Sequence, residues 1–312
     1  MRAQIAFNRE VSAAYRHLGV VAPGFPCSFA PGQFVMARSP FSVDPFLPRA
    51  FSIYQLSSAD EGGAPVVEIL YKVLGKGTQC LARMERGQEV ELLGPLGNSF
   101  TLYEGLDVAV LVAGGIGVPP IAALARQIRN PQYAIRDCEV FLGGKTSEDI
   151  LCAKDFEAVG ANIHITTEDG SMGTRGLITD LLDPFLDSLG AQTIRQSGNQ
   201  DPPHRRTAAP PNQPSRVCVY TCGPPGMLAA VARLAEARGV PCQASVEANM
   251  AGGFGACMGC AIALRTEEMD RRYALVCKDG PVFDSRVIDW GGGNPGLRSC
   301  GCHQSGVEGR MP

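Results

Sequence analysis

The strongest constraint on the fold is a change of sequence pattern near residue 105. Before it, short apolar segments alternate with Gly, Pro and Asn turns, at 33–37, 50–56, 65–73 and 88–94. After it, apolar strands alternate with helical segments, beginning with a strand at 107–115 and a helix at 119–130. Many short strands are typical of an antiparallel barrel or sandwich, whereas strand–helix alternation is typical of a doubly wound parallel sheet. We therefore expect two domains of different class.

The rest of the chain divides by composition. Residues 192–215 are polar and rich in proline, which is typical of a disordered surface insertion. A group of cysteines follows the last predicted strand–helix unit, and the C-terminal residues are rich in glycine. We predict a β-barrel at 1–102, an α/β domain at 103–240, a small cysteine domain at 241–290 and a flexible tail at 291–312.

Charge and hydropathy exclude several functions. The 312 residues include 28 Lys and Arg against 31 Asp and Glu, a net charge of −3, which argues against nucleic-acid binding because such proteins carry a basic surplus. No apolar run reaches the roughly 20 residues of a membrane helix, and the N-terminal MRAQIAFNRE lacks the layout of a secretory signal. We expect a cytoplasmic protein whose 12 cysteines are mostly reduced thiols or metal ligands.

Two segments of the first domain carry residues that suit a phosphate. Gly75 and Gly77 permit close approach of the backbone, and Thr78 is predicted to cap a helix that begins near Gln79. Backbone amides at such a helix start bind phosphate well, although an ordinary strand-to-helix turn explains the pattern equally. The earlier segment RAFSIY, at 49–54, is by itself only a strand with one arginine and a hydroxyl.

Two turns of the second domain follow apolar strands. Gly114, Gly115 and Gly117 end a strand and open a helix, where parallel sheets bind nucleotide phosphates. Their spacing is not G-x-G-x-x-G, so the motif alone is a weak to moderate signal. The turn TCGPPGM places Cys222 at the same expected edge of the sheet, and a buried small thiol is the simpler interpretation of that cysteine.

The third group is a glycine-rich cysteine loop. Cys257 and Cys260 are spaced as C-x2-C, and Cys277 lies 17 positions after Cys260. Two thiolates this close can share one metal centre. Three cysteines are one short of a tetrathiolate site, and the spacing leaves a reduced or redox-active thiol pair as the alternative.

In this order, the motifs resemble the electron-transfer subunits of type B dihydroorotate dehydrogenase, a branch of the ferredoxin–NADP reductase superfamily. The resemblance covers residues 5–290. Its most specific parts are GKGT with LLGPLGNSF, LVAGGIGVPP, FLGGKTSEDIL, TEDGSMGTRG, the Cys-Gly-Pro turn and CKDGPVF. It implies an N-terminal antiparallel β-barrel that binds FAD, an α/β NAD domain with a doubly wound parallel sheet, and a small C-terminal iron–sulfur domain.

The resemblance also implies roles for the motif residues. On the flavin side, Arg49 would meet the FAD pyrophosphate, Phe51 and Ser52 the isoalloxazine, and the segment with Gly75, Gly77 and Thr78 a second part of the flavin phosphates. On the nicotinamide side, Gly114, Gly115 and Gly117 match the NAD phosphate loop, and Cys222 matches the cysteine placed near the nicotinamide.

The stretch after the third strand of the α/β domain gives a physical reason for a cofactor preference. Relatives that use NADP place Ser and Arg there to hold the 2′-phosphate, whereas this chain has Glu168 and Asp169. Two carboxylates repel a phosphate and accept hydrogen bonds from ribose hydroxyls. We therefore predict NAD as the cofactor.

The cysteine loop departs from the family pattern at one position. The family carries C-x4-C-x2-C followed by a distant cysteine, and Cys257, Cys260 and Cys277 match three of these ligands, but Gly252 stands at the first position. Three interpretations compete: a substitute ligand, a labile or absent cluster, and a sequence change in a loop that otherwise keeps its function. We favour a retained [2Fe–2S] cluster. The substitute ligands considered are Cys242, Cys300 and Cys302.

The function implied by the resemblance is relay electron transfer in pyrimidine biosynthesis. An FMN-containing catalytic subunit would oxidise dihydroorotate, and electrons would pass through [2Fe–2S] and FAD to NAD⁺ within a heterotetramer. Three alternatives stay open. They are a subunit of a sulfide dehydrogenase or of an NADH-dependent ferredoxin–NADP oxidoreductase, an NADH:flavin reductase without a cluster, and a non-catalytic interaction subunit.

Overall fold

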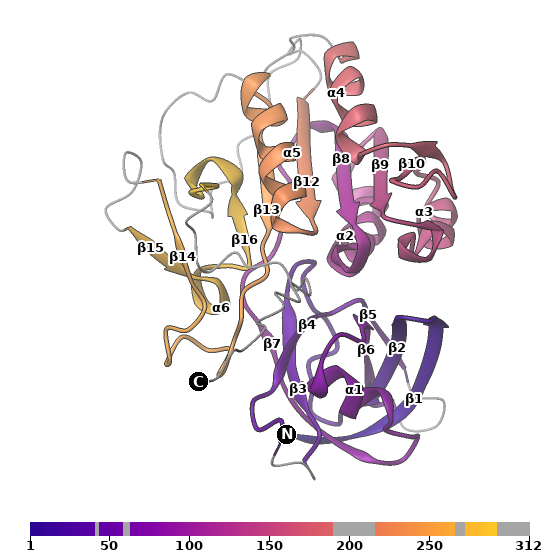
Figure 1. Ribbon diagram of the computed structural model, residues 1–312, viewed down its shortest axis with the longest axis vertical. Helices are drawn as coiled ribbons and strands as arrows, with labels where there is room; N and C mark the ends of the chain where they lie inside the picture. The colour runs from indigo at the N-terminus through magenta and orange to yellow at the C-terminus, as the bar shows by residue number, and fades with distance from the viewer. Residues whose placement is uncertain (41–43, 59–62, 190–215, 266–271, 292–312) are drawn as a thin grey trace, which may run out of the picture.

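The chain folds into a curled antiparallel sheet, a mainly parallel sheet covered by helices, and a C-terminal segment that contacts both (Figure 1). The computed structural model describes residues 1–40, 44–58, 63–189, 216–265 and 272–291. The predicted insertion at 192–215 and the predicted tail beyond residue 291 lie outside the described residues. The predicted fold class, β plus α/β, is confirmed.

The N-terminal sheet has seven strands in the order β4-β3-β7-β1-β2-β6-β5, and every pair is antiparallel. Its interior is apolar, with Leu18, Val35, Ile53 and Ile69 almost completely buried. The strands are β1 (Arg2–Ser12), β2 (Tyr15–Val21), β3 (Phe34–Arg38), β4 (Arg49–Ser52), β5 (Gln55–Ser58), β6 (Pro65–Lys72) and β7 (Glu89–Leu96), and the helix α1 (Lys76–Ala82) follows β6.

The hairpin of β1 and β2 is the part of this sheet whose strands were not predicted individually from the sequence. Only Ala3 and Ile5 of β1 are buried, and its second half is polar and largely exposed. Shifts of register between Ile5 and Phe7, and between Glu10 and Ser12, break the alternation of buried and exposed residues. A half-buried strand is identified in a sequence by apolar and polar residues that alternate with a period of two. A bulge inserts an extra residue and so interrupts this alternation.

The second sheet has the order β11-β10-β9-β8-β12-β13-β16. Helices α2 and α3 pack on one face, and α4 and α5 pack on the other. The strands are β8 (Leu106–Gly114), β9 (Asp137–Gly144), β10 (Asn162–Thr167), β11 (Thr174–Arg175), β12 (Arg216–Cys222), β13 (Cys242–Ser245) and β16 (Val282–Asp284). The helices are α2 (Val118–Ile128), α3 (Ala153–Ala158), α4 (Ile178–Ser188) and α5 (Pro225–Ala237), with short 3-10 turns at Gly115–Gly117, Pro131–Tyr133, Ser147–Asp149 and Ser285–Val287.

The chain order of this sheet reverses at its centre. β9 and β10 extend the sheet to one side of β8, whereas β12 and β13 extend it to the other, and all of these strands are parallel. This reversal puts the switch point of the sheet at the carboxyl ends of β8 and β12, the position where open α/β sheets bind ligands.

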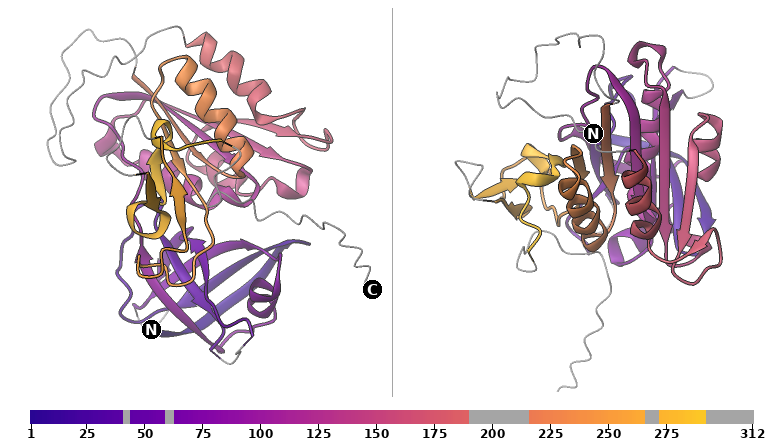
Figure 2. Two further views of the ribbon diagram at one scale, coloured as in Figure 1. Left: turned by 60° about the vertical axis from the view of Figure 1, so that its left-hand side comes forward. Right: turned by 90° about the horizontal axis from the view of Figure 1, so that it is seen from above.

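The C-terminal segment is built onto the edge of the parallel sheet. Its strand β16 pairs antiparallel with β13, so the predicted domain boundary at residue 240 falls before a strand that belongs to the parallel sheet. The segment also contains β14 (Ala261–Ala263), β15 (Tyr273–Leu275) and the one-turn helix α6 (Val276–Asp279). Figure 2 shows it lying along the parallel sheet and the barrel, and Asn98 Nδ2 donates across this junction to the backbone oxygens of Asp279 and Val282.

Two carboxylates of the α/β domain, Asp149 and Asp155, join it to the barrel. The Tyr15 hydroxyl donates to Asp149 Oδ1 at 2.5 Å, and Lys72 Nζ donates to the same oxygen at 3.1 Å. The Tyr54 hydroxyl donates to Asp155 Oδ1 at 2.6 Å. We call Asp149 and Asp155 the interdomain carboxylates.

Among the helices of the described residues, none is both long enough and apolar enough to cross a membrane.

Candidate functional site

The first part of the site is the contact between the glycine loop after β8 and the turn after β12. A Cβ atom on Gly117 would lie 2.3 Å from the backbone oxygen of Cys222, and one on Gly114 would lie 2.6 Å from Met227 Sδ. Separations below 3.0 Å are not tolerated against backbone. The predicted nicotinamide-side residues are therefore brought together, and Gly117 is required by the backbone of the neighbouring turn.

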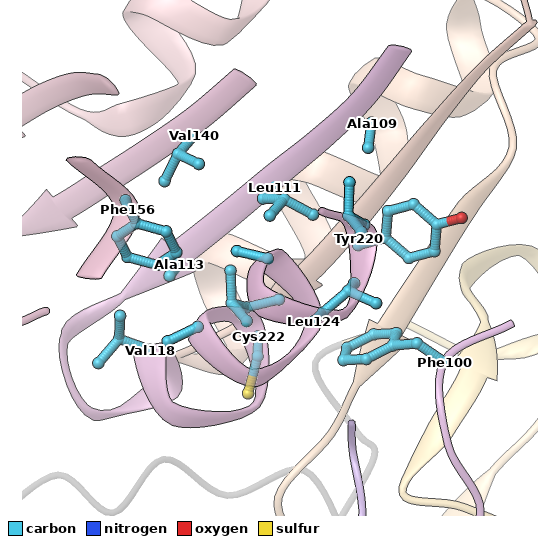
Figure 3. Close-up of a cluster of buried hydrophobic side chains, with 14 of the residues drawn as sticks. Phe100, Ala109, Leu111, Ala113, Val118, Leu124, Val140, Phe156, Tyr220 and Cys222 are labelled. Carbon is cyan, nitrogen blue, oxygen red and sulfur yellow. The ribbon is translucent and has the colours of Figure 1, made fainter. Parts of the chain in front are cut away.

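Cys222 ends β12 at this edge of the sheet and is only 2% exposed. Figure 3 shows its sulfur at the rim of the apolar cluster formed by β8, β12 and α2. Burial first, and then the negative charge of Glu247, raise the pKa of the Cys222 thiol well above its ordinary value. Because thiolate is the nucleophilic form, Cys222 is a neutral packing or hydrogen-bonding group at neutral pH.

Glu168 and Asp169 follow β10 at the same edge of the sheet. Their backbone N–H groups donate to the backbone oxygens of Gly144 and Lys145, at 3.1 and 3.2 Å. Asp169 Oδ1 accepts from the hydroxyl and the backbone N–H of Ser171, which lowers the pKa of Asp169. Both residues are exposed, and β10 is two strands from β8, or about 10 Å. They thus present negative charge at this edge of the sheet, two strands away from the glycine loop.

On the flavin side, the structure brings Arg49 onto the start of α1. A Cβ atom on Gly77 would lie 2.9 Å from Arg49 Nε, so the guanidinium lies against the backbone there, while a Cβ atom on Gly75 would meet nothing within 4 Å. Arg49 Nη1 donates to the backbone oxygen of Leu47 at 2.8 Å. A cation beside an unobstructed backbone segment fits a diphosphate.

Thr78 differs from its predicted role. The helix begins at Lys76, with Gly75 as N-cap, so Thr78 lies inside the first turn instead of preceding the helix. Its Oγ1 accepts from the backbone N–H groups of Leu74 and Gly75, at 2.9 and 3.2 Å, and donates to Gly75 O. The hydroxyl reaches backward to the N-cap, as the third residue of a capping box does.

Phe51 and Ser52 lie on β4, next to Arg49. Phe51 is 9% exposed, and its ring packs edge-on against Tyr71 with centroids 5.6 Å apart. Most of the Phe51 ring therefore belongs to the barrel core, whereas Ser52 is partly exposed. The contact of both residues with the isoalloxazine stays a prediction.

The cysteine loop contains one closely spaced pair of sulfurs. Cys260 Sγ and Cys277 Sγ are 3.2 Å apart and buried. Gly255 N–H is directed at Cys277 Sγ at 3.1 Å, and Cys277 N–H at Cys260 Sγ at 3.4 Å. Burial and the neighbouring Cys260 raise the pKa of Cys277 to about 11. Amides directed at sulfur are among the features that tune thiolate-bound iron–sulfur centres.

Cys257 lies on the outer side of this pair and is exposed. Backbone N–H groups of Gly259 and Gly252 lower the pKa of its thiol. In the described ranges, no three His, Cys, Asp or Glu side chains are grouped so that they could hold one metal ion. The structure therefore brings Cys260 and Cys277 together and leaves Cys257 nearby, without a fourth ligand.

The structure excludes Cys242 as the substitute ligand. Cys242 opens β13, pairs with Val219 and is buried in the core between the sheet and helices α4 and α5. Cys260 and Cys277 belong to a different core cluster, in the C-terminal segment. The other two substitute candidates, Cys300 and Cys302, lie outside the described residues.

Comparisons with known proteins find two matching domain families and similar whole chains. Residues 247–289 match the sequence model of the iron–sulfur cluster binding domain of dihydroorotate dehydrogenase B, and residues 111–183 match that of an oxidoreductase NAD-binding domain. A dihydroorotate dehydrogenase B (NAD⁺) electron transfer subunit from Desulforamulus reducens is 32% identical over 292 residues, 91% of this chain and 98% of that protein. One from Bacillus caldolyticus is 34% identical over 255 residues, 81% of this chain and 84% of that protein.

The chain belongs to the family of dihydroorotate dehydrogenase B electron transfer subunits.

Solved structures confirm the fold expected for this family. A structure of NADH-dependent reduced ferredoxin–NADP oxidoreductase superposes with a TM-score of 0.70 at 22% identity, over 92% of this chain and 90% of that one. The ferredoxin–NADP⁺ reductase from Neisseria gonorrhoeae, solved with FAD and NADP bound, has a TM-score of 0.55 at 16% identity, over 77% of this chain and 91% of that one.

The sequence match at residues 247–289 indicates an iron–sulfur centre, whereas the structure of this loop brings two of its thiols, Cys260 and Cys277, into contact and, in the described residues, does not group three ligands around one position. The thiols of Cys257, Cys260 and Cys277 are of the type that holds such clusters, and backbone amides are directed at all three. Gly252 has no side chain, so Cys257, Cys260 and Cys277 are the thiols that the described part of this loop could offer to a cluster.

Three residues near the site, Glu247, Asp149 and Asp155, were not predicted from the sequence. Glu247, two residues beyond β13, lies close enough to Cys222 to raise its pKa. Asp149 lies within the segment FLGGKTSEDIL, and Asp155 follows shortly after it, but no spacing rule links either carboxylate to a barrel tyrosine. Glu247 could have been found from its position just after the carboxyl end of β13. That strand had been predicted to belong to the cysteine domain and not to the parallel sheet.

Proposed function

We propose that this chain is the electron-transfer subunit that carries electrons from a dihydroorotate-oxidising catalytic subunit to NAD⁺, an oxidoreductase step of pyrimidine biosynthesis. The single observation that carries the proposal is the identity of 31–34% with curated subunits of this kind over most of the chain. The glycine loop and the Cys222 turn support it, because they meet at the switch point of the parallel sheet.

Residues of the barrel would bind FAD, and residues of the α/β domain would bind NAD. FAD, when bound, exchanges single electrons on one side and a hydride on the other. Arg49 and the backbone at Gly75 would hold its diphosphate. The loop with Gly114, Gly115 and Gly117 would hold the NAD phosphates.

Two further features would act on the nicotinamide cofactor. The neutral Cys222 thiol would pack near the nicotinamide and help to orient it. The Glu168 and Asp169 carboxylates would accept from the ribose hydroxyls and repel the 2′-phosphate of NADP. The residue roles are supported by the placement of these groups along one edge of the sheet.

The partner would be an FMN-containing catalytic subunit in a cytoplasmic heterotetramer. The relatives' description as electron transfer subunits supports a catalytic partner. The cysteine loop supports an electron route to the catalytic subunit, because Cys257, Phe254 and Met258 are exposed on its surface and could face a partner.

A second candidate is a subunit of an NADH-dependent ferredoxin–NADP oxidoreductase or a sulfide dehydrogenase. The superposition on the first of these, over 92% of the chain, favours it. The reaction would keep FAD and the nicotinamide cofactor but change the electron donor.

The proposal is tested by mixing the purified chain, with FAD bound, anaerobically with NADH and recording the flavin absorbance. We expect rapid bleaching by NADH and much slower bleaching by NADPH. Comparable rates with the two nucleotides would contradict the cofactor assignment. No bleaching would favour the non-catalytic interaction role, and bleaching in a preparation without iron or sulfide would favour the reductase without a cluster.

A further inference from the structure

Each oxygen of the Asp149 carboxylate bonds to a different domain. Oδ1 accepts from the Tyr15 hydroxyl at 2.5 Å and from Lys72 Nζ at 3.1 Å, both on the barrel. Oδ2 accepts from the backbone N–H groups of Lys145 and Thr146, at 3.1 and 3.4 Å, in the loop that follows β9. The side chain of Asp149 is 14% exposed. A single, largely buried carboxylate therefore ties this loop of the α/β domain to the barrel.

The loop at 144–149 supports the turn that follows β10. The backbone N–H groups of Glu168 and Asp169 donate to backbone oxygens of the loop, at 3.1 and 3.2 Å. A backbone N–H of the loop donates to Ser171 Oγ at 2.8 Å, and this hydroxyl donates in turn to Asp169 Oδ1. A displacement of Asp149 relative to the barrel would therefore carry the exposed Glu168 and Asp169 with it.

On the barrel side, strand pairing sets the positions of Tyr15 and Lys72. The two residues are opposite each other in the antiparallel pair of β2 and β6, where facing side chains are neighbours, and Lys72 Nζ lies 4.8 Å from the centroid of the Tyr15 ring. Tyr15 is 2% exposed and belongs to the same apolar cluster as Val118 of α2. Its hydroxyl lies 3.6 Å from the position that a Cβ atom on Gly115 would take. The same hydroxyl that bonds to Asp149 thus lies beside the glycine loop.

The contact at the other interdomain carboxylate, Asp155, is built from more interactions. The Tyr54 hydroxyl and Arg126 Nη1 both donate to Asp155 Oδ1, at 2.6 and 3.2 Å. Arg126 Nη2 also donates to the backbone oxygen of Tyr54 at 2.6 Å, and its Cζ lies 4.5 Å from the centroid of the Tyr54 ring. This contact joins the two domains independently of Asp149. A change at Asp149 should therefore loosen one side of the junction and leave the fold intact.

We propose that Asp149 is a positioning residue for hydride transfer. Through its two barrel partners, it holds the glycine loop and the turn after β10 in a fixed place relative to the barrel. The proposal rests on the proposed function, in which the barrel carries FAD and the α/β domain binds NAD. Reacting atoms must approach to about 3–3.5 Å, and a displacement of about 1 Å can slow such a step about 100-fold. Asp149 thus acts through the placement of the two domains and not on the reacting atoms.

The test measures hydride transfer and nucleotide binding separately, in the full-length chain with FAD bound. Tyr15→Phe and Lys72→Met remove the barrel partners of Asp149 and keep the carboxylate with its bonds to the loop. Stopped-flow absorbance gives the limiting rate of FAD reduction by NADH. Calorimetry gives the dissociation constant of ADP-ribose, which has the diphosphate and adenosine of NADH but lacks the nicotinamide. Tyr133→Phe is the matched control, because the Tyr133 hydroxyl accepts from Gln127 Nε2 at 2.7 Å within the α/β domain.

We expect the limiting rate to fall about 10-fold in Tyr15→Phe and Lys72→Met and about 100-fold in Asp149→Ala. The dissociation constant of ADP-ribose should be unchanged in the two barrel variants, and Tyr133→Phe should match the wild-type chain in both measurements. Lys72→Arg keeps the cation and should restore most of the rate. Tyr15→Phe should add little to Asp149→Ala, because changes that break one shared interaction are not additive.

Three results would overturn the proposal. They are a wild-type limiting rate in both barrel variants, a loss of ADP-ribose affinity as large as the loss of rate, and additive effects of Tyr15→Phe and Asp149→Ala. Any of these, in a chain whose FAD is bleached normally by NADH before substitution, contradicts the positioning role alone. A wild-type chain that NADH does not bleach contradicts the proposed function and the positioning role together.

Discussion

The glycine loop after β8 and the cysteine loop at 252–260 look alike in sequence and differ in the structure. Both are rich in glycine and both match motifs of one family. At Gly117 a side chain would strike the backbone of the Cys222 turn at 2.3 Å. At Gly252 a side chain would meet only the edge of an exposed ring, at 3.2 Å. The first glycine is required by packing, whereas packing does not require the second, which the resemblance places at the position of a family ligand.

This difference shows what each loop contributes. In the proposed function, the glycine loop would act through its backbone, whose shape requires glycine at position 117. The cysteine loop would act through its side chains, so we expect a substitution at position 252 to change its chemistry and leave the fold intact. We expect the largest effect at the glycine loop itself, and smaller effects at Cys222, at the interdomain carboxylate Asp149 and at the exposed Glu168.

The first prediction sets Gly117→Ala against Gly252→Ala. The Cβ atom at 117 must displace backbone, so we expect the free energy of unfolding to fall by about 1–3 kcal/mol, the usual range for overpacking. Gly252→Ala should change it by less than about 0.5 kcal/mol, as surface substitutions do. Urea unfolding of both variants with FAD bound measures the difference. Equal effects at the two positions would remove the contrast between the loops.

The second prediction concerns Cys222 at the end of β12. Cys222→Ser should slow reduction of FAD by NADH roughly 10- to 100-fold, because small displacements of a hydride donor have effects of that size. Burial keeps the pKa of this thiol high, so the wild-type rate should not change between pH 7 and 9 through this group. Stopped-flow absorbance measures both, with the exposed Cys27→Ser as control. An unchanged rate in Cys222→Ser would place this cysteine away from the nicotinamide.

The third prediction concerns the interdomain carboxylate Asp149, which accepts a hydrogen bond from the Tyr15 hydroxyl. This hydroxyl also lies beside the glycine loop, 3.6 Å from the position that a Cβ atom on Gly115 would take. Burial alone would raise the pKa of Asp149, but hydrogen bonds from Tyr15 and Lys72 outweigh it and lower the pKa. Because the pKa of Asp149 is lower in the folded state, its carboxylate adds to the unfolding free energy at pH values above its unfolded pKa of about 3.9. This stabilisation is lost as the pH falls through the pKa of the folded state.

We therefore expect Asp149→Asn to lower the unfolding free energy at pH 7 by about 1 kcal/mol and to lose less stability than the wild-type chain below about pH 4. Urea unfolding at several pH values measures this. Parallel pH profiles for the two proteins would show that Asp149 does not titrate with folding.

The fourth prediction is the smallest and concerns cofactor choice. Glu168→Ser removes one exposed charge, so kcat/KM for NADPH should rise by about fivefold relative to NADH, since exposed charges act with energies of up to about 1 kcal/mol. Steady-state rates with both nucleotides measure the ratio. Glu157→Ser, an exposed carboxylate on α3, is the matched control and should leave the ratio unchanged.

The sequence predicted the parts of the molecule in which a local pattern carries the information. The strand of β8 with its glycines and α2 was predicted to within a few residues, because apolar periodicity and proline at the helix start are local signals. The resemblance assigned both Arg49 and Gly77 to the flavin phosphates, and the structure places these two residues in contact.

The sequence did not reveal what depends on distant contacts. The bond between Tyr54 and Asp155 joins residues 101 positions apart, and no periodicity predicts it. The assignment of β13 to the parallel sheet depends on pairing with β12. Thr78 was placed before its helix because a Thr cap and a Thr at the third position give the same local pattern, and only the hydrogen bonds separate them.

The most direct test of the central claim is the reduction of NAD⁺ by dihydroorotate in a complex of this chain with its co-purified catalytic subunit, followed as NADH absorbance. The account predicts NADH formation that requires both subunits and dihydroorotate, and that falls sharply with Cys222→Ser. A stable complex, containing FAD and iron, that oxidises dihydroorotate but forms no NADH would contradict it.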